Sequence, residues 1–163
     1  IMDRLMASGE KKLTVELLEG LMGLAPRELV GKLIDAFADG DPKPALDSAA
    51  SLLATGTGPD QLLESLIERL RDLMVLCACG PETSLVELTG DARKEEVERS
   101  QRFDAAGLVH MIALCESVQR STRSSANPRA LLDALVVRLA MTEKLADITT
   151  LVRQLEGAAA GKG

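Results

Sequence analysis

Residues 60–79 carry apolar side chains at a spacing of three and four residues, and no other feature of the chain constrains the fold as strongly. This spacing places them along one stripe of an α-helix, whereas a half-buried β-strand alternates every second residue. The stripe comprises Leu62, Leu63, Leu66, Ile67, Leu70, Leu73, Met74 and Cys77. We therefore expect one long helix that buries a broad face against a core.

Signals for helix starts recur along the chain, and alternating strand patterns are missing. Asp41-Pro42 and Asn127-Pro128 each combine a capping side chain with a proline suited to the first helical turn. Pro26 and Pro59 occupy similar positions, and Asp104 can cap a further helix. Segments ending near residues 40, 55 and 79 follow the first of these signals, and the segment after Asp104 runs into the stretch that begins at residue 121. The sequence predicts an all-α fold, a compact bundle of roughly five to seven helices.

The sequence allows two lengths for the last predicted helix. After Asn127-Pro128, apolar residues continue near the helical period through Leu145, Val152 and Leu155. An unbroken helix over 128–156 would be about 43 Å long. Thr142-Glu143 offers a second cap, so a kink there is the alternative.

Composition narrows the classes of function. The 163 residues carry a formal net charge of −6, which opposes a general phosphate-binding surface. Phe37 and Phe103 are the only aromatic residues, so stacking platforms for single-stranded nucleic acid are missing and the core must be aliphatic. No segment has the apolar length needed to span a bilayer, and the first residues lack a signal-peptide pattern. We expect a cytoplasmic protein with no direct nucleic-acid or membrane binding.

Candidate catalytic and metal-binding groups are sparse. Cys77 and Cys79 form a Cys-x-Cys pair, but a structural zinc site needs four ligands, and Cys115 and His110 lie far away in the sequence. We expect all three cysteines to be buried thiols and His110 to be a structural or surface residue. The stretch TGTGPD lacks the Lys-Ser/Thr pair of a phosphate-binding loop. The sequence therefore predicts no catalytic, metal-binding or cofactor-binding residues in this chain.

The charged stretch ARKEEVERSQR is predicted to form a solvated helix face. Glu95 with Arg99 and Glu98 with Arg102 have the favourable i,i+4 order, and each such pair contributes about 0.3 to 0.5 kcal/mol. The adjacent carboxylates Glu95 and Glu96 fit a charge-balanced surface better than an acid–base pair.

Four stretches, taken in their order along the chain, resemble the C-terminal part of the gamma/tau subunits of the bacterial DNA polymerase III clamp loader. IMDRLMASGEKKLTVELLEGLMG resembles the end of the family's second AAA+ domain. The first helical pair of the family's third, or collar, domain is similar to ELVGKLIDAFADGDPKPALDSAASLLATG. The long helix that follows it in the family is similar to GPDQLLESLIERLRDLMVLCACG. RSSANPRALLDALVVRL resembles the elbow before the last collar helix. The resemblance covers residues 1–141.

The resemblance implies a division of the chain and a function. Residues 1–23 would be a remnant of the preceding helical lid domain, 24–156 the helical collar, and 157–163 a flexible tail. The collar would be an oligomerisation domain that holds AAA+ subunits in the ring that loads the sliding clamp in DNA replication. Its partners would be the C-terminal domains of other clamp-loader subunits, with self-association as a further option. A stand-alone helical adaptor or regulatory domain that binds a partner protein is the alternative.

The ATPase residues of the family have no counterpart in this sequence. Walker A and Walker B motifs are missing, and the sensor-2 arginine would lie just before Ile1. ATP and Mg²⁺ would bind in the full-length AAA+ ATPase, which is part of the DNA polymerase III holoenzyme, and this fragment would not be an enzyme.

Arginines flank the polar elbow over residues 121–128 and could pair with acids on a neighbouring subunit. They are Arg120, Arg123, Arg129 and Arg138. Ordinary solvated arginines are the alternative. Asn127 and Pro128 themselves are expected to start the next helix.

Overall fold

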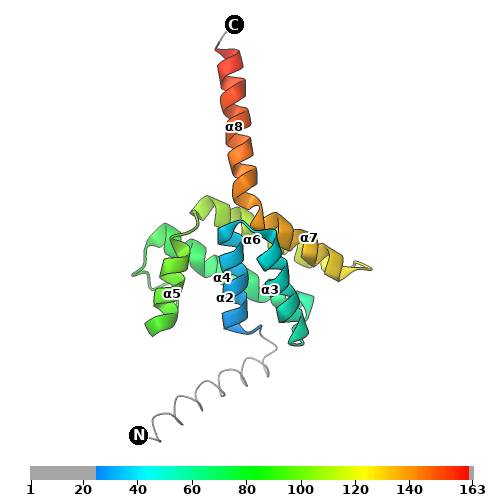
Figure 1. Cartoon of the computed structure of the whole chain (residues 1–163). Coiled ribbons are helices and arrows are strands. Elements are labelled where there is room, and N and C mark those ends of the chain that lie inside the picture. The colour runs from blue at the N-terminus through cyan, green and yellow to red at the C-terminus, as the bar shows by residue number, and fades with distance from the viewer. Residues whose placement is uncertain (1–24, 162–163) are drawn as a thin grey trace, which may run out of the picture.

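Helix α4, Pro59–Cys79, is the centre of the fold. The computed structural model describes residues 25–161, with the backbone only for 143–150. Leu62, Leu63, Leu66, Leu70 and Leu73 on α4 are completely buried, which confirms the helix and the apolar stripe predicted from their spacing. α6 packs along α4 more extensively than any other helix does (Figure 1).

The described part of the chain consists of helices joined by short connections, and it contains no strand. The fold class, an all-α bundle of five to seven helices, is confirmed. The bounds are α2 Arg27–Asp39, α3 Pro42–Ala54, α4 Pro59–Cys79, α5 Gly90–Ser100, α6 Ala105–Thr122, α7 Pro128–Ala140 and α8 Thr142–Ala160. The proposed lid remnant over residues 1–23 lies outside the described residues.

Three of the predicted caps form as the sequence indicates. The Asp41 carboxylate accepts the Lys43 backbone N–H at 3.1 Å, and the Asp104 carboxylate accepts that of Gly107 at 3.2 Å. The Asn127 side chain accepts the backbone N–H of Ala130 at 3.2 Å. Each side chain thus satisfies a donor that has no partner within its own helix.

The core is aliphatic, as the composition requires. Four helices pack against α4 or against each other: α2, α3, α6 and α7. Each contributes buried leucine, valine, isoleucine, alanine or methionine side chains to the core. Phe37 on α2 is the one aromatic residue of this core that is fully enclosed, with 2% of its surface exposed. Gly40 ends α2 with a φ of +70°, a conformation that glycine adopts without steric cost.

The segment after residue 128 is two helices rather than one. α7 ends at Ala140 and α8 begins at Thr142, with Met141 between them, so the alternative with a kink is correct. The Thr142 hydroxyl does not cap α8, because it donates to the Arg138 carbonyl at 3.0 Å. α8 projects away from the bundle and continues through Ala160, into the stretch expected to be a flexible tail (Figure 1).

Helices that could cross a membrane are absent from the described residues, since none combines sufficient length with sufficient apolarity.

Candidate interaction surface

The elbow between α6 and α7 is fixed by short-range hydrogen bonds and by one tertiary contact. The Ser125 hydroxyl accepts the Asn127 backbone N–H at 3.1 Å, just before the Asn127 cap. Thr122, at the end of α6, is buried, and its hydroxyl lies 3.1 Å from the Asp60 carboxylate in the first turn of α4. The elbow is therefore attached to the start of the central helix, and the chain direction of α7 is set by the fold.

The four arginines predicted as interface residues are all exposed, but they do not form a single cluster. Arg129 pairs with Asp133 of its own helix at 3.2 Å. Arg129 and Arg138 lie nine residues apart on α7, which places them about half a turn apart around the helix. Arg120 and Arg123 lie at the end of α6, and the described residues provide neither with an ion-pair partner. Of the four arginines, Arg120 and Arg123 are thus the two available for an ion pair with another molecule.

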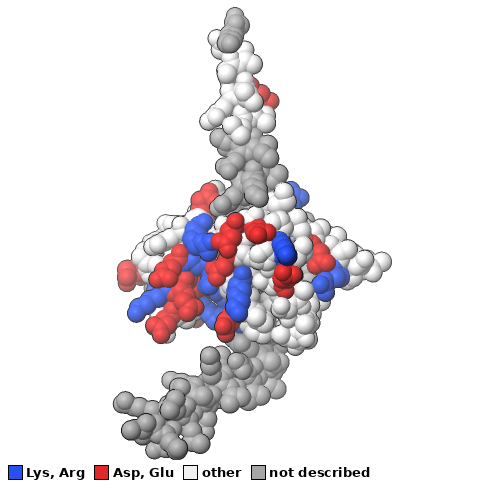
Figure 2. Space-filling view, in the orientation of Figure 1, with Lys and Arg blue, Asp and Glu red and all other residues white. Residues whose placement is uncertain are grey.

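A buried ion network joins α2, α4 and α5, and this feature was not predicted. Glu96 is 0% exposed and accepts hydrogen bonds from both Arg69 and Arg99. The Arg69 Nε atom lies 3.3 Å from Glu96 Oε2, and the Arg99 Nε atom lies 2.7 Å from Asp35 Oδ1 on α2. Opposite charges are interleaved over α2 and α5 on the surface as well (Figure 2).

This network corrects the prediction that residues 92–102 present a solvated face with two i,i+4 pairs. Among the described ion pairs, Arg99 binds Glu96 and Asp35, and Arg102 binds Asp35 and Asp39, so neither expected partner is used. The sequence does contain one signal. Arg69 falls within the apolar stripe of α4, between Leu66 and Leu73, where a charged residue needs a buried partner.

The packing of the network depends on Gly31. A Cβ atom at this position would lie 3.1 Å from Arg99 Nη2 and 3.5 Å from Arg69 Nη2. Hydrogen bonding to Asp35 raises the pKa of Arg99, and burial followed by the charge of Arg69 lowers the pKa of Arg27. The Arg27 carbonyl also accepts a bond from Arg69 at 3.0 Å. These ion pairs hold α2, α4 and α5 together. Because Arg69 and Arg99 occupy the two carboxylate oxygens of Glu96, this residue is unavailable for acid–base chemistry.

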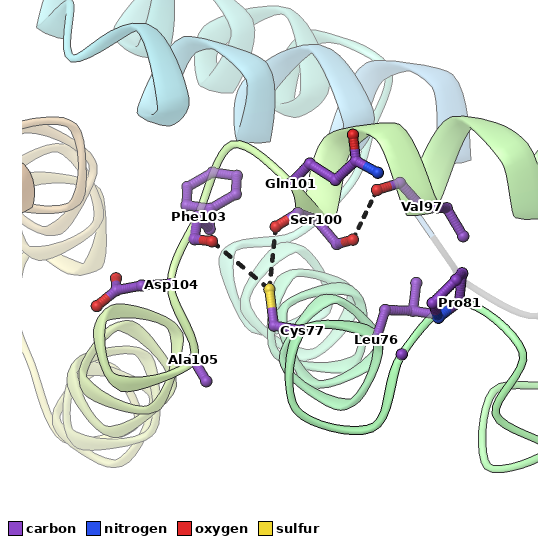
Figure 3. A pocket seen from close by; sticks show the side chains of 10 residues that line it. Leu76, Cys77, Pro81, Val97, Ser100, Gln101, Phe103, Asp104 and Ala105 are labelled. Carbon is purple, nitrogen blue, oxygen red and sulfur yellow. Dashed lines mark hydrogen bonds between the residues drawn. The ribbon is translucent and has the colours of Figure 1, made fainter.

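A groove of about 350 Å³ lies where α4 ends and α6 begins (Figure 3). The Cys77 thiol donates to the Ser100 carbonyl at 3.0 Å and contacts the Phe103 carbonyl at 3.6 Å. Burial, and next the charge of Asp104, raises the pKa of Cys77, so its thiolate is disfavoured. Cys77 and Asp104 are the only titratable side chains that line the groove, and Asp104 caps α6. The groove therefore lacks an activated nucleophile.

The remaining thiols and the histidine are dispersed. Cys115 is fully buried on α6, as expected, and burial raises its pKa to about 12. Cys79 is exposed and Cys77 is only partly buried, so the prediction that all three cysteines are buried is correct for Cys115 alone. Cys79 is the last residue of α4 and lies beyond Cys77, the last residue of this helix that packs against the core. His110 is exposed on α6. In the part of the chain that the structure describes, no three His, Cys, Asp or Glu side chains are grouped to hold a metal ion.

Comparison with known proteins gives a consistent match over this helical body. A family model described as DNA polymerase III subunits gamma and tau domain III matches residues 13–155. Similar proteins include the DNA polymerase III subunit gamma/tau of Mycobacterium bovis and that of Mycobacterium tuberculosis. Each is 25% identical over 159 residues, which cover 96% of this chain. The chain spans 28% of the length of these relatives.

Proposed function

Since the chain belongs to the family of DNA polymerase III subunits gamma and tau, domain III, we propose that it is the collar domain of a clamp-loader subunit. In this proposal the domain packs side by side with the C-terminal domains of other loader subunits in the cytoplasm. It thereby holds the AAA+ modules in the ring that loads the sliding clamp during DNA replication. ATP and Mg²⁺ would bind in the rest of the protein, and the chain described here would supply assembly only.

The observation that carries this proposal is the extent of the family match, which runs from residue 13 through every helix of the bundle and into α8. The chemistry of the described residues agrees with a role in assembly. The buried acid Glu96 is neutralised by two arginines, and the Cys77 and Cys115 thiols have raised pKa values. These groups serve packing, and the exposed surface remains for contacts with partners.

Within this function, we assign Arg120 and Arg123 to a contact with acids on a neighbouring subunit. Both lie beside an elbow whose direction is fixed by the Thr122–Asp60 hydrogen bond. A fixed surface binds with a lower entropy cost than one that must become ordered on contact. Arg129 and Arg138 would contribute less, because Arg129 already binds Asp133 and Arg138 lies on the other side of α7.

The test is a titration of this chain with the C-terminal domains of the other loader subunits, followed by size-exclusion chromatography with light scattering. The collar function predicts a complex whose mass is the sum of its components. A chain that keeps its own mass in every mixture would contradict it. Binding to an unrelated partner, with no binding to any loader domain, would favour the adaptor function instead.

A further inference from the structure

Residues 81–102, referred to below as the α5 segment, contact the rest of the molecule mainly through polar groups. The segment comprises α5, the connection that leads to it from α4 and the first residues of the turn that follows. Glu96 and Ser100 are the only buried residues of α5, and both are polar. Among the described helices, α4 alone packs extensively against α5. Because a helix in a protein is held mostly by a packed apolar face, apolar contact joins α5 only weakly to the bundle.

Ion pairs join the α5 segment to α4 and to α2. Glu96 is 0% exposed and binds Arg69 of α4. Arg99 binds Asp35 of α2 at 2.7 Å. Separation of the helices would return both members of each pair to water, and their hydration offsets most of the lost attraction. Opening of the α5 segment therefore costs less free energy than exposure of an apolar face of the same size.

Arg93 holds the α5 segment together internally. This side chain lies on α5, and all three nitrogens of its guanidinium group donate to carbonyls of the preceding connection. The acceptors are the carbonyls of Pro81, Thr83, Val86 and Leu88, at 2.6 to 3.1 Å. Val86 is 2% exposed, yet it lies outside the main core cluster of the bundle. The connection and α5 are therefore more closely tied to each other than to the core.

We propose that the α5 segment is a lid over the end of α4, latched by Glu96, that opens as one unit while the rest of the bundle stays folded. Its two hinges are Gly80, which ends α4, and the turn before α6. The hydrogen bond from Cys77 to the Ser100 carbonyl crosses the seam that opens (Figure 3). The open lid uncovers Arg69 and Cys77 of α4. Opening needs no other subunit, so it stands or fails independently of the collar function.

Hydrogen exchange of the backbone amides, measured by mass spectrometry on the whole chain, tests the lid. Amides that are released by a local opening exchange faster than amides that wait for global unfolding. In the unaltered chain we expect the amides of α5 to share one level of protection, at least tenfold below that of the core amides in α6 and α7. Equal protection of the three helices would overturn the proposal. Protection that declines steadily toward the ends of α5 would indicate fraying and would also overturn it.

Glu96→Gln tests the latch. It leaves Arg69 and Arg99 without their shared counter-charge in the closed state only, so we expect exchange of the α5 amides to become roughly a hundredfold faster. Glu95→Gln is the control on the same helix and should change this exchange by less than about twofold, since Glu95 is exposed. Asp35→Asn keeps the buried Arg69–Glu96 pair and should accelerate exchange about threefold, which provides a milder variant if Glu96→Gln does not fold. Unchanged exchange of α5 in Asp35→Asn and in a folded Glu96→Gln would rule out the latch.

Val136→Ala separates opening of the lid from unfolding of the whole molecule. Val136 is 0% exposed on α7, a helix that lacks extensive contact with α5 in the described structure. The cavity left by the truncation destabilises the bundle whether the lid is open or closed. We expect core amides of α6 and α7 to exchange tenfold or more faster, with the exchange of α5 unchanged. If Val136→Ala accelerates α5 by the same factor as the core, the molecule opens only as a whole and the lid does not exist.

Discussion

Glu96 shows how one buried charge can determine the position of a helix. α5 carries mostly charged side chains, and Glu96 and Ser100 are its only buried residues. Apolar burial therefore contributes little to its docking. The carboxylate of Glu96 lies between Arg69 and Arg99, and Arg99 extends the contact to Asp35. Because removing one member of a buried ion pair leaves the other charge without compensation, this site should be sensitive to a change of a single atom.

Glu96→Gln keeps the shape of the side chain and removes its charge. We expect the free energy of unfolding to fall by about 3 kcal/mol, because two guanidinium groups lose their shared counter-charge in a buried site. Urea denaturation followed by circular dichroism measures this change. Glu95→Gln is the matched control, since Glu95 is exposed and its change should stay within about 0.5 kcal/mol. Equal losses for the two variants would show that the network contributes nothing specific.

Cys115 makes stability depend on alkaline pH. Its pKa is about 12 in the folded chain, against about 8.5 for a thiol in an unfolded one. Above pH 8.5 the unfolded state binds fewer protons than the folded state, so the free energy of unfolding must fall as pH rises. For this residue the loss should reach about 1 to 2 kcal/mol at pH 10.

Cys115→Ala should remove this part of the pH dependence, although it lowers stability at every pH by leaving a small cavity. The measurement is urea denaturation at pH 7 and pH 10, with the difference between the two pH values compared for each variant. Cys79→Ala, at an exposed thiol, should keep the pH difference of the unaltered chain. A pH difference in Cys115→Ala as large as that of the unaltered chain would contradict the assignment to this thiol.

At the scale of helices, the sequence predicts what local chemistry decides. The caps at Asp41, Asp104 and Asn127 depend on a side chain and a backbone N–H two or three residues away, so the residue types suffice to find them. The 80–90 connection is different. Arg93 shapes it by donating to the carbonyls of Pro81, Thr83, Val86 and Leu88. Carbonyl acceptors occur at every residue, and therefore leave no sequence pattern.

The same distinction explains the errors at the candidate site. The i,i+4 pairs expected for Arg99 and Arg102 are local, but α2 brings Asp35 and Asp39 within reach, and these tertiary partners are preferred. The exposed position of Cys79 likewise depends on where α4 leaves the core. The four elbow arginines could be recognised as exposed from their polar context, whereas their distribution around α7 and the pairing of Arg129 required the helix geometry.

The Asn127 cap gives a prediction for α7. Asn127→Ala removes the acceptor for the Ala130 backbone N–H, and we expect a loss of about 1 kcal/mol in the free energy of unfolding. Asn127→Ser keeps a capping oxygen and should lose much less. Thermal unfolding followed by circular dichroism checks both variants. Indistinguishable midpoints for alanine and serine would mean that Pro128 and the Thr122–Asp60 contact are enough to fix the elbow.

At the scale of the whole molecule, two kinds of surface lie on one fold. The bundle presents charged and polar side chains, including the exposed arginines of the elbow, and α8 presents an apolar face away from the bundle. Contacts through the elbow should be sensitive to ionic strength, because charges at the rim of an interface are screened by salt. Any contact made through α8 should be much less sensitive, since apolar burial does not depend on charge. The two surfaces can therefore be separated experimentally.

Charge reversal at the elbow is the corresponding prediction. Arg120→Glu combined with Arg123→Glu should weaken the complex with other loader domains by roughly tenfold at low salt, and by less at high salt, because reversed charges repel the acids of the partner. Titration calorimetry at two salt concentrations measures both effects. The double variant should fold normally, since both arginines are exposed at the end of α6 and surface substitutions of this kind usually change stability by no more than about 0.5 kcal/mol.

Lys32→Glu combined with Lys43→Glu is the matched control, because these exposed lysines lie on α2 and α3, away from the elbow, and undergo the same change in charge. If both double variants weaken the complex equally, the effect follows from net charge and the elbow has no special role. If neither does, Arg120 and Arg123 are ordinary solvated arginines. A loss confined to the elbow variant, and reduced by salt, would identify an electrostatic contact with the neighbouring subunit, because net charge alone would act equally through either pair of residues.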